Sequence, residues 1–208
     1  MNRLFEAGGK VLAFGAHPDD LEVGAGGLLA RLASEGDRVM MAVVSIPNQA
    51  EKRRAEARAG ADVLGAELRS LFDDGPTRVE DIPMHELVRR FDHVIGDFRP
   101  DLVITHSAHD LHWDHSLVNR ATVSALRRTP CDLLAFLSSP EMNAQSRAIG
   151  QCFADISDTI ETKISAIGAH TSQVPKLDLE SSRDLARAMG RISGYQYAES
   201  YEALRVRI

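Results

Sequence analysis

Two short segments of this chain concentrate residues suited to metal and proton-transfer chemistry. The first is His-Pro-Asp-Asp at residues 17–20, and the second is Asp-Leu-His-Trp-Asp-His at residues 110–115. The 208 residues contain eight histidines, of which four lie within residues 106–115. Imidazole is the commonest metal ligand and the usual acid or base near neutral pH. This uneven distribution predicts a functional site.

The first segment has two interpretations. It follows an apolar run at residues 10–16 and precedes a helical pattern at residues 21–35. Aspartate is favoured at a helix N-cap, where a carboxylate also interacts well with the helix dipole. Capping explains either Asp19 or Asp20, but it does not explain His17 and a second carboxylate in the same turn. A helix cap and a catalytic or metal site therefore both stay open for this turn.

The glycines at positions 15, 24, 26 and 27 raise the alternative of a nucleotide site. Phosphate-binding loops place glycines in the strand-to-helix turn so that backbone N–H groups can approach the anion. Here the turn holds Pro18 and two acids, which would repel phosphate. Neither a G-x-G-x-x-G nor a Walker pattern is present. A nicotinamide cofactor or ATP at this turn is excluded, and we expect the later glycines to allow close packing of the helix on a sheet.

In the second segment, His112 and His115 are three residues apart, so a turn or helix start points both to one side. Asp110 and Asp114 are close enough to accept the second ring N–H of the imidazoles, which is the usual support for a metal-binding histidine. A solvated loop with a helix cap at Asp114 is the alternative. Two imidazoles and one carboxylate are a common set for a catalytic zinc, and other divalent metals accept the same ligands.

An alternation of strand and helix patterns must position the two segments. Apolar runs predict strands at residues 10–16, 38–45, 67–72, 102–105 and 132–137, and amphipathic patterns predict helices at residues 21–35, 49–64, 82–98 and 114–126. This order predicts an α/β, three-layer Rossmann-like fold with a mostly parallel sheet and helices on both faces. In such sheets ligands bind at the carboxyl ends of the strands, and both segments follow a strand. The pattern is weaker after residue 138, with a strand at 152–156 and helices at 158–170 and 181–192.

Composition indicates one domain over residues 1–208. The formal net charge of −6 argues against binding to nucleic acid or anionic membranes. No apolar run approaches the roughly 18 residues of a membrane span, and the N-terminus lacks the layout of a signal peptide. Cys131 and Cys152 make neither a disulfide framework nor a cysteine zinc site. We expect a cytoplasmic protein without nucleic-acid or membrane partners, and the sequence leaves open whether it forms a homo-oligomer.

Taken together, the segments resemble the PIG-L/LmbE-like family of metal-dependent de-N-acetylases. The resemblance rests on V-L-A-F-G-A-H-P-D-D-L-E-V-G-A-G-G at residues 11–27 and on D-x-H-x-D-H at residues 110–115. R-x-x-E at 53–56, L-G at 64–65, H-x-S-Q at 170–173 and Y-A-E at 197–199 are similar as well, so the resemblance runs through most of the chain. Trp113 stands where the family usually has proline, which affects the expected loop geometry rather than the ligands.

The resemblance implies a role for each residue of the two segments. His17, Asp20 and His115 would bind Zn²⁺ or another divalent metal. Asp19 would be the general base toward the zinc-bound water, and His112 would face the oxyanion or protonate the leaving amine. The implied protein is a single deacetylase domain over residues 1–208 that removes the N-acetyl group of a small-molecule amino sugar or glycoside. The chemistry agrees, because zinc lowers the pKa of bound water from 15.7 to about 7.

Three further side chains are candidates for substrate binding, each with an alternative. Arg53 could reach the substrate or belong to a solvated helix face. Trp113 could stack on a sugar ring or pack the loop, and His170 could border the pocket or lie at a helix end. His106 and His109 could support the ligands from behind, and neither is predicted to be a ligand itself.

Two other functions stay open beside deacetylation. One is hydrolysis of another amide or an ester, including a phosphoester, on the same metal site. The other is a non-catalytic carbohydrate- or metal-binding module, against which the spare carboxylate of Asp19 counts.

Overall fold

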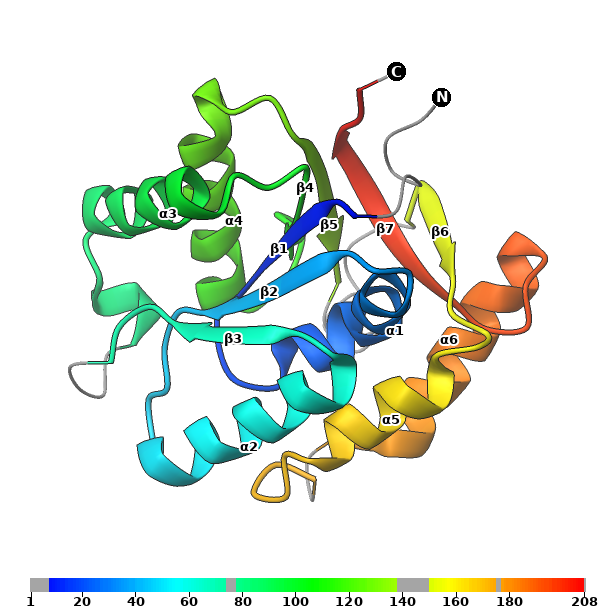
Figure 1. The fold of residues 1–208 in the computed structure, drawn as a ribbon. Coiled ribbons are helices and arrows are strands. Elements are labelled where there is room, and N and C mark those ends of the chain that lie inside the picture. Colours follow the sequence, from blue (N-terminus) through cyan, green and yellow to red (C-terminus); the bar gives the residue numbers. More distant parts are fainter. Residues whose placement is uncertain (1–7, 74–77, 138–149, 175–176, 208) are drawn as a thin grey trace.

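The computed structural model describes residues 8–73, 78–137, 150–174 and 177–207. Strands and helices alternate along most of the chain (Figure 1). The order is β1 (Lys10–Gly15), α1 (Asp20–Ser34), β2 (Arg38–Val43), α2 (Ala50–Leu64), β3 (Glu67–Ser70), η2 (Val79–Asp81), α3 (Met84–Phe98), β4 (Leu102–His106), α4 (Trp113–Ala125), η3 (Leu126–Arg128), β5 (Asp132–Phe136), β6 (Cys152–Asp155), α5 (Ile160–Gly168), α6 (Leu179–Ser193) and β7 (Ala198–Arg205).

The strands form one sheet in the order β3-β2-β1-β4-β5-β7-β6. The first five of these strands are parallel, and β7 pairs antiparallel with both β5 and β6. From β1 the chain builds outward to β2 and β3 on one side, and later to β4 and β5 on the other. The strand order therefore reverses between β1 and β4. In open α/β sheets the ligand crevice lies outside the carboxyl ends of the strands at this reversal.

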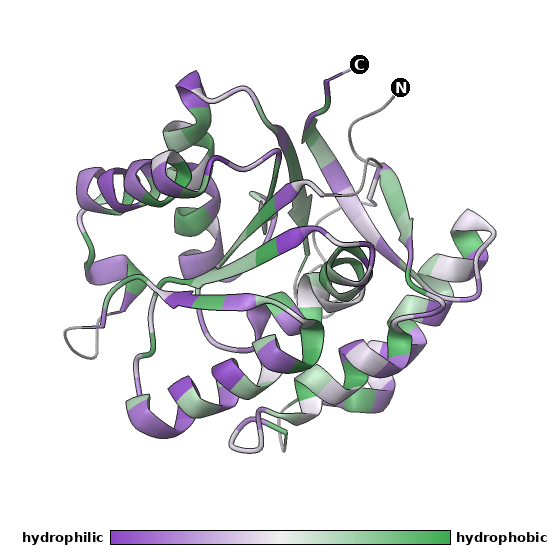
Figure 2. Ribbon diagram, in the orientation of Figure 1, coloured by the Kyte–Doolittle hydropathy of each residue, from purple (hydrophilic) through white to green (hydrophobic). Residues whose placement is uncertain are grey.

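Both faces of the sheet are covered, which explains why β1 shows no polar alternation. Leu12 and Phe14 pack toward α3 and α4, and Phe14 stacks on Phe91 with ring centroids 4.1 Å apart. Val11 and Ala13 pack on the other face, toward α1 and α2. Figure 2 shows hydrophobic residues along the central strands and hydrophilic residues on the outer side of α2. The predicted α/β, Rossmann-like fold with a mostly parallel sheet is confirmed.

Strand β7 is the element that the sequence analysis does not predict. Its sequence, A-E-S-Y-E-A-L-R, is rich in residues that favour helices, and it lacks a run of β-branched residues. Pairing with β5 on one side and β6 on the other overrides this local preference. No helix of the described residues is long and apolar enough to cross a membrane.

Gly24 determines how closely α1 packs on the sheet. A Cβ atom at this position would lie 2.0 Å from Cδ2 of Phe136, which is fully buried on β5. We therefore expect Gly24→Ala to lower the free energy of unfolding by about 1–3 kcal/mol, because the overpacking outweighs the higher helix propensity of alanine.

Gly96 of α3 offers a matched control, since a Cβ there would meet nothing within 4 Å. Gly96→Ala should raise the free energy of unfolding by up to about 1 kcal/mol. Urea unfolding of the two variants measures both effects, and equal shifts would contradict the close packing at Gly24.

Candidate active site

The two chemistry-bearing segments meet at the carboxyl ends of β1 and β4. The carboxylate of Asp20, the first residue of α1, lies among three imidazoles. Its Oδ1 is 3.4 Å from Nε2 of His115, in the first turn of α4. Its Oδ2 is 3.2 Å from Nε2 of His106, at the end of β4, and 3.7 Å from Nδ1 of His17, just after β1. The site therefore combines residues from both sides of the strand-order reversal.

The turn at residues 17–20 is held in an unusual backbone conformation. Asp20 Oδ2 accepts the backbone N–H of His17 at 2.8 Å, which closes the turn. Asp19, the residue before α1, has φ 95°, and its side chain makes no cap hydrogen bond. A left-handed conformation costs a non-glycine residue about 1–3 kcal/mol, and such strain concentrates at functional sites. Helix capping therefore does not explain the carboxylate of Asp19.

The described residues include two overlapping groups whose ligand atoms lie within 4.8 Å of one another: His17, His112 and His115, and Asp20, His106 and His115. The predicted ligands His17, Asp20 and His115 take members from both groups. Ligand atoms about 2.1 Å from a tetrahedral zinc are roughly 3.4 Å apart. Asp20 lies 3.4 Å from His115 through Oδ1 and 3.7 Å from His17 through Oδ2, so each of these two pairs is close to the spacing of two ligands on one ion.

Each of the two candidate ligand imidazoles is held by a separate carboxylate at its other nitrogen. Nδ1 of His115 lies 2.8 Å from Oδ2 of Asp110, and Nε2 of His17 lies 3.0 Å from Oδ2 of Asp114. In a neutral ring whose one nitrogen donates to its carboxylate, the other nitrogen, Nε2 of His115 or Nδ1 of His17, would carry a lone pair on the side of Asp20. Burial opposes the ionisation of Asp110, but its hydrogen bond with His115 keeps its pKa below the ordinary value. This is the outer support that metal-binding histidines usually have.

Asp110 lends itself to a test, because its Oδ1 also accepts the backbone N–H of His112 at 2.9 Å. In Asp110→Asn, one of these two donors would face the amide NH₂ instead of an acceptor. We expect the affinity for the bound divalent ion to fall about 10- to 100-fold, measured by competition with a chromogenic chelator.

Asp132→Asn is the control for this variant. Asp132 is also a buried aspartate, but it lies at the amino end of β5 and pairs with Arg207. Its replacement should lower stability and leave metal affinity unchanged. Equal losses of affinity in the two variants would contradict the role of Asp110.

Asp19 lies beside this cluster and contacts Arg53. Nη2 of Arg53 donates to the carbonyl oxygen of Pro18 at 3.0 Å and to Oδ2 of Asp19 at 3.4 Å. Burial and the neighbouring Asp20 carboxylate raise the pKa of Asp19 to about 7, against the opposing effect of Arg53. The carboxyl group can therefore both accept and release a proton near neutral pH. Arg53 itself is 6% exposed, so it does not belong to a solvated helix face.

His112 stands at the exposed side of the cluster. Its Nδ1 accepts the backbone N–H of Asp114 at 3.2 Å, and its ring stacks on that of His115 at 4.4 Å. Burial and the neighbouring imidazoles lower the pKa of His112. A neutral ring whose Nδ1 accepts carries its proton on Nε2. His112 therefore offers an N–H donor rather than a cation at the mouth of the site.

His170 is fully buried behind the first turn of α1. Its Nε2 lies 2.9 Å from Oε1 of Glu22, and the missing side chain of Gly60 leaves room for the pair. Against the effect of burial, the hydrogen bond to Glu22 raises the pKa of His170. Glu56 of α2 accepts hydrogen bonds from Thr171 and Ser172, so the motifs at residues 53–56 and 170–173 are in contact. His170 presents no surface to a ligand in this structure.

Trp113 and His109 are exposed, whereas His106 is not. Trp113 is 54% exposed at the start of α4, and the guanidinium of Arg120 lies 5.7 Å from its ring centroid. Its indole is therefore not used to pack the loop. His106 is fully buried, its Nε2 accepts the backbone N–H of Ala16 at 3.0 Å, and its ring stacks on His115 at 3.9 Å. The sequence analysis assigns no ligand role to His106; its position directly after the predicted strand at residues 102–105 was the available signal.

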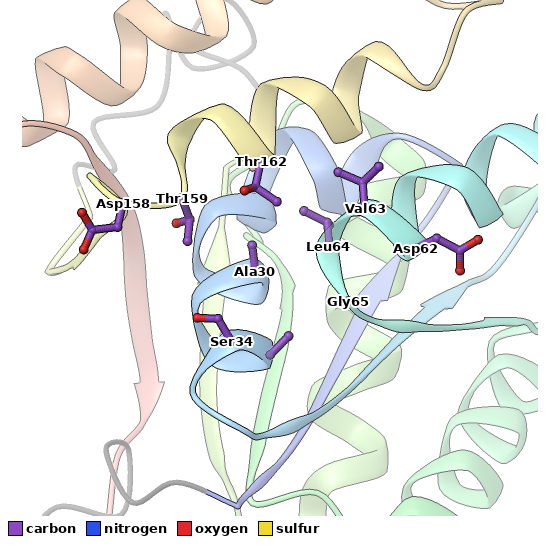
Figure 3. Close-up of a pocket in the computed structure, with 10 residues that line it drawn as sticks. Ala30, Ser34, Asp62, Val63, Leu64, Gly65, Asp158, Thr159 and Thr162 are labelled. Carbon is purple, nitrogen blue, oxygen red and sulfur yellow. The ribbon is translucent and has the colours of Figure 1, made fainter.

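A separate pocket of about 490 Å³ lies between α1, α2 and α5 (Figure 3). It lies at the C-terminal ends of α1 and α2, whereas the cluster lies at the N-terminal end of α1. Its lining contains none of the candidate metal-binding, catalytic or substrate-binding residues: Ala30, Ala33, Ser34, Asp62, Val63, Leu64, Gly65, Asp158, Thr159 and Thr162. It is therefore not the site of the predicted chemistry.

Comparison with known families gives one match, the model described as PIG-L, GlcNAc-PI de-N-acetylase, over residues 12–126. The match covers more than half of the chain and contains both chemistry-bearing segments. The chain belongs to the PIG-L family. The resemblance read from the sequence is thereby confirmed, and with it the class of enzyme, an N-deacetylase.

Two curated members of the PIG-L family have similar sequences. The diacetylchitobiose deacetylase of Thermococcus kodakarensis is 29% identical over 96% of this chain and 84% of its own length. The probable N-acetyl-alpha-D-glucosaminyl L-malate deacetylase 2 of Bacillus cereus is 26% identical over 78% of this chain and 83% of its own length.

Solved structures share the fold of this PIG-L family member. The N,N'-diacetylchitobiose deacetylase of Pyrococcus horikoshii aligns with a TM-score of 0.77 and 19% identity, covering 96% of this chain and 87% of that one. GalB, the 4-carboxy-2-hydroxymuconate hydratase of Pseudomonas putida, aligns with a TM-score of 0.78 and 22% identity, covering 96% and 98%. A hydratase and a deacetylase thus share this fold, so the reaction must be argued from the site.

Proposed function

We propose that the chain is a divalent-metal-dependent hydrolase that removes the acetyl group from an N-acetylated amino sugar or glycoside. The observation that carries this proposal is the convergence of His17, Asp20 and His115, with each imidazole supported by its own carboxylate and Asp19 beside them. The two curated relatives are named as deacetylases of N-acetylated sugars, which supports the substrate class.

His17, Asp20 and His115 would hold the ion. A set of two imidazoles and one carboxylate favours zinc, and other divalent metals accept the same donors. When bound, such a cation lowers the pKa of a water ligand and polarises the acetyl carbonyl group.

The remaining residues would move protons and stabilise charge. Asp19 accepts a proton from the attacking water as the new C–O bond forms, and it returns that proton to the nitrogen as the C–N bond breaks. Arg53 fixes the orientation of Asp19. The Nε2–H of His112 donates to the carbonyl oxygen as negative charge develops there. The products are acetate and the free amine.

Substrate contacts fall to the exposed side of the site. The exposure of Trp113 supports stacking on a sugar ring. Arg53 and His170 are buried, which argues against the predicted contact with substrate. Instead, Arg53 would hold Asp19 in place, and His170 would hold the first turn of α1 through Glu22. A single domain over residues 1–208 and a cytoplasmic location remain predictions from the sequence, which leaves self-association open.

Acetate release tests the proposal directly. The purified chain should release acetate from a panel of N-acetylhexosamine conjugates, lose this activity with a chelator, and regain it with added Zn²⁺, Co²⁺ or Mn²⁺. Metal analysis should give one ion per chain. Bound metal without acetate release across the panel would support a binding module instead. Two ions per chain would favour phosphoester hydrolysis, which often uses a pair of metals.

A further inference from the structure

Glu202, on β7, is a buried carboxylate that the proposed reaction does not use. It is 9% exposed, and its Oε1 accepts the hydroxyl of Ser107 at 2.7 Å. Among the described residues no lysine, arginine or histidine forms an ion pair with it. Burying a carboxylate without a neighbouring cation costs free energy, so the buried position of Glu202 needs an explanation. Its hydrogen bond to Ser107 indicates what the residue does.

Ser107 connects Glu202 to the turn that follows β4. Its Oγ accepts the backbone N–H of His109 at 3.0 Å, and its carbonyl oxygen accepts the N–H of Asp110 at 3.4 Å. Its own N–H donates to the carbonyl of Phe136, at the end of β5, at 2.7 Å. Every hydrogen-bonding group of this buried serine is therefore used to fix the turn at residues 107–110.

The turn at residues 107–110 positions Asp110, which orients the ring of His115 in the candidate metal site. Asp110 accepts the backbone N–H of His112 through Oδ1 and contacts the ring of His115 through Oδ2. Its carbonyl oxygen also accepts the hydroxyl of Ser116. A continuous series of hydrogen bonds thus runs from Glu202 through Ser107 and Asp110 to His115.

We infer that Glu202 is a positioning residue for the metal centre, acting through the Ser107 hydroxyl. The inference rests on the proposed function, because His115 is one of the proposed ligands. Glu202 faces the opposite side of β7 from its neighbour Tyr201, which is part of the core beside α1. The two residues therefore allow the effect on the site to be separated from the general stability of the strand.

The first experiment measures metal affinity. Glu202→Ala should weaken Zn²⁺ or Co²⁺ binding about tenfold or more, as loss of outer support for a ligand does, in competition with a chromogenic chelator. Glu202→Gln keeps an oxygen that can accept from Ser107, so it should retain most of the affinity. Tyr201→Phe, which removes a buried hydrogen bond to Glu199, should lower stability and leave affinity unchanged.

A double-mutant cycle checks the route. Ser107→Ala alone should weaken binding at least as much as Glu202→Ala, because it also removes the acceptor of the His109 N–H. The double variant should lose little more than Ser107→Ala, because the connection to Glu202 is already broken. Additive losses would mean that Glu202 acts by a path that does not pass through Ser107, and would overturn the inference.

A second measurement needs no metal and no activity. In the metal-free chain, hydrogen exchange of the backbone amides at residues 107–116 should be faster in Glu202→Ala than in the wild type, and unchanged in Tyr201→Phe. Unchanged affinity and unchanged exchange in Glu202→Ala would show that the residue is merely structural. Glu202→Gln falling as far as Glu202→Ala would show that charge rather than hydrogen bonding matters, which also overturns the inference.

A failure of the proposed function can be distinguished from a failure of this inference by metal binding to the wild-type chain. If the wild-type chain bound no divalent ion, the metal centre itself would be wrong and this inference would fall with it. If the wild type binds the ion and the Glu202 variants bind equally well, only the positioning role of Glu202 fails.

Discussion

Asp19→Asn should lower the turnover for acetate release by about 10²- to 10⁴-fold while the chain keeps its metal. Asparagine has nearly the same shape as aspartate and tolerates the left-handed backbone that Asp19 adopts. Its amide oxygen can still accept from Arg53. It cannot take up a proton, so the variant removes the proposed base and little else. Steady-state kinetics and metal analysis on the same preparation measure the two quantities.

Asp178→Asn is a matched control for this substitution. Asp178 is also the residue before a helix, but its carboxylate does cap the helix, accepting the N–H groups of Glu180 and Ser181. Its replacement should affect stability and not turnover. If Asp19→Asn lost the ion and kept its turnover per bound ion, Asp19 would be a ligand rather than the base.

Glu199→Leu should be the most destabilising single change among those considered, at about 3–5 kcal/mol. The buried carboxylate accepts the backbone N–H groups of Gly27 and Leu28 at 2.8 Å, the ammonium of Lys163 at 2.5 Å and the hydroxyl of Tyr201 at 2.7 Å. Its removal leaves a buried cation and three further donors without their acceptor. The change in the free energy of unfolding can be measured in urea.

Lys163→Met provides the comparison within the same network. It removes one donor, and the other three still satisfy the carboxylate, so it should cost clearly less than Glu199→Leu. Equal losses would mean that the Lys163 ion pair alone accounts for the stabilisation. A larger loss in Lys163→Met would contradict the central place of Glu199.

The parallel part of the sheet was predictable because local patterns and tertiary structure agree there. β1, β2, β4 and β5 are apolar on both sides and are flanked by helices with clear ends, such as Gly65 after α2. β7 was not predictable, because its residues favour a helix locally and the strand forms through its pairing with β5 and β6. Because this segment was not assigned to a strand, the burial of Glu199 and Glu202 could not be predicted, although Glu199 belongs to the Y-A-E motif at residues 197–199.

Residue type and spacing indicate the two chemistry-bearing segments, and the resemblance to the family singles out the candidate ligands within them. Neither reveals how the side chains are arranged. Spacing within residues 110–115 indicates that His112 and His115 share a side. It does not reveal that Asp110 holds one imidazole while Asp114 reaches across to His17, 97 residues away along the chain. The role of His106 could not be predicted for the same reason, since its contacts with Ala16 and Asp20 join the end of β4 to the turn between β1 and α1.

The strand-order reversal has a consequence for how the protein is held together. His17 and His115 lie on opposite sides of it, separated by nearly half of the chain, so an ion bound by both, as proposed, would be a cross-link that closes a long loop. The unfolded chain has no such preformed site, and an ion that binds only the folded state adds RT ln(1 + [L]/Kd) to its stability, about 2.7 kcal/mol at a hundredfold excess over Kd. Metal supply would then regulate the lifetime of the protein as well as its catalysis.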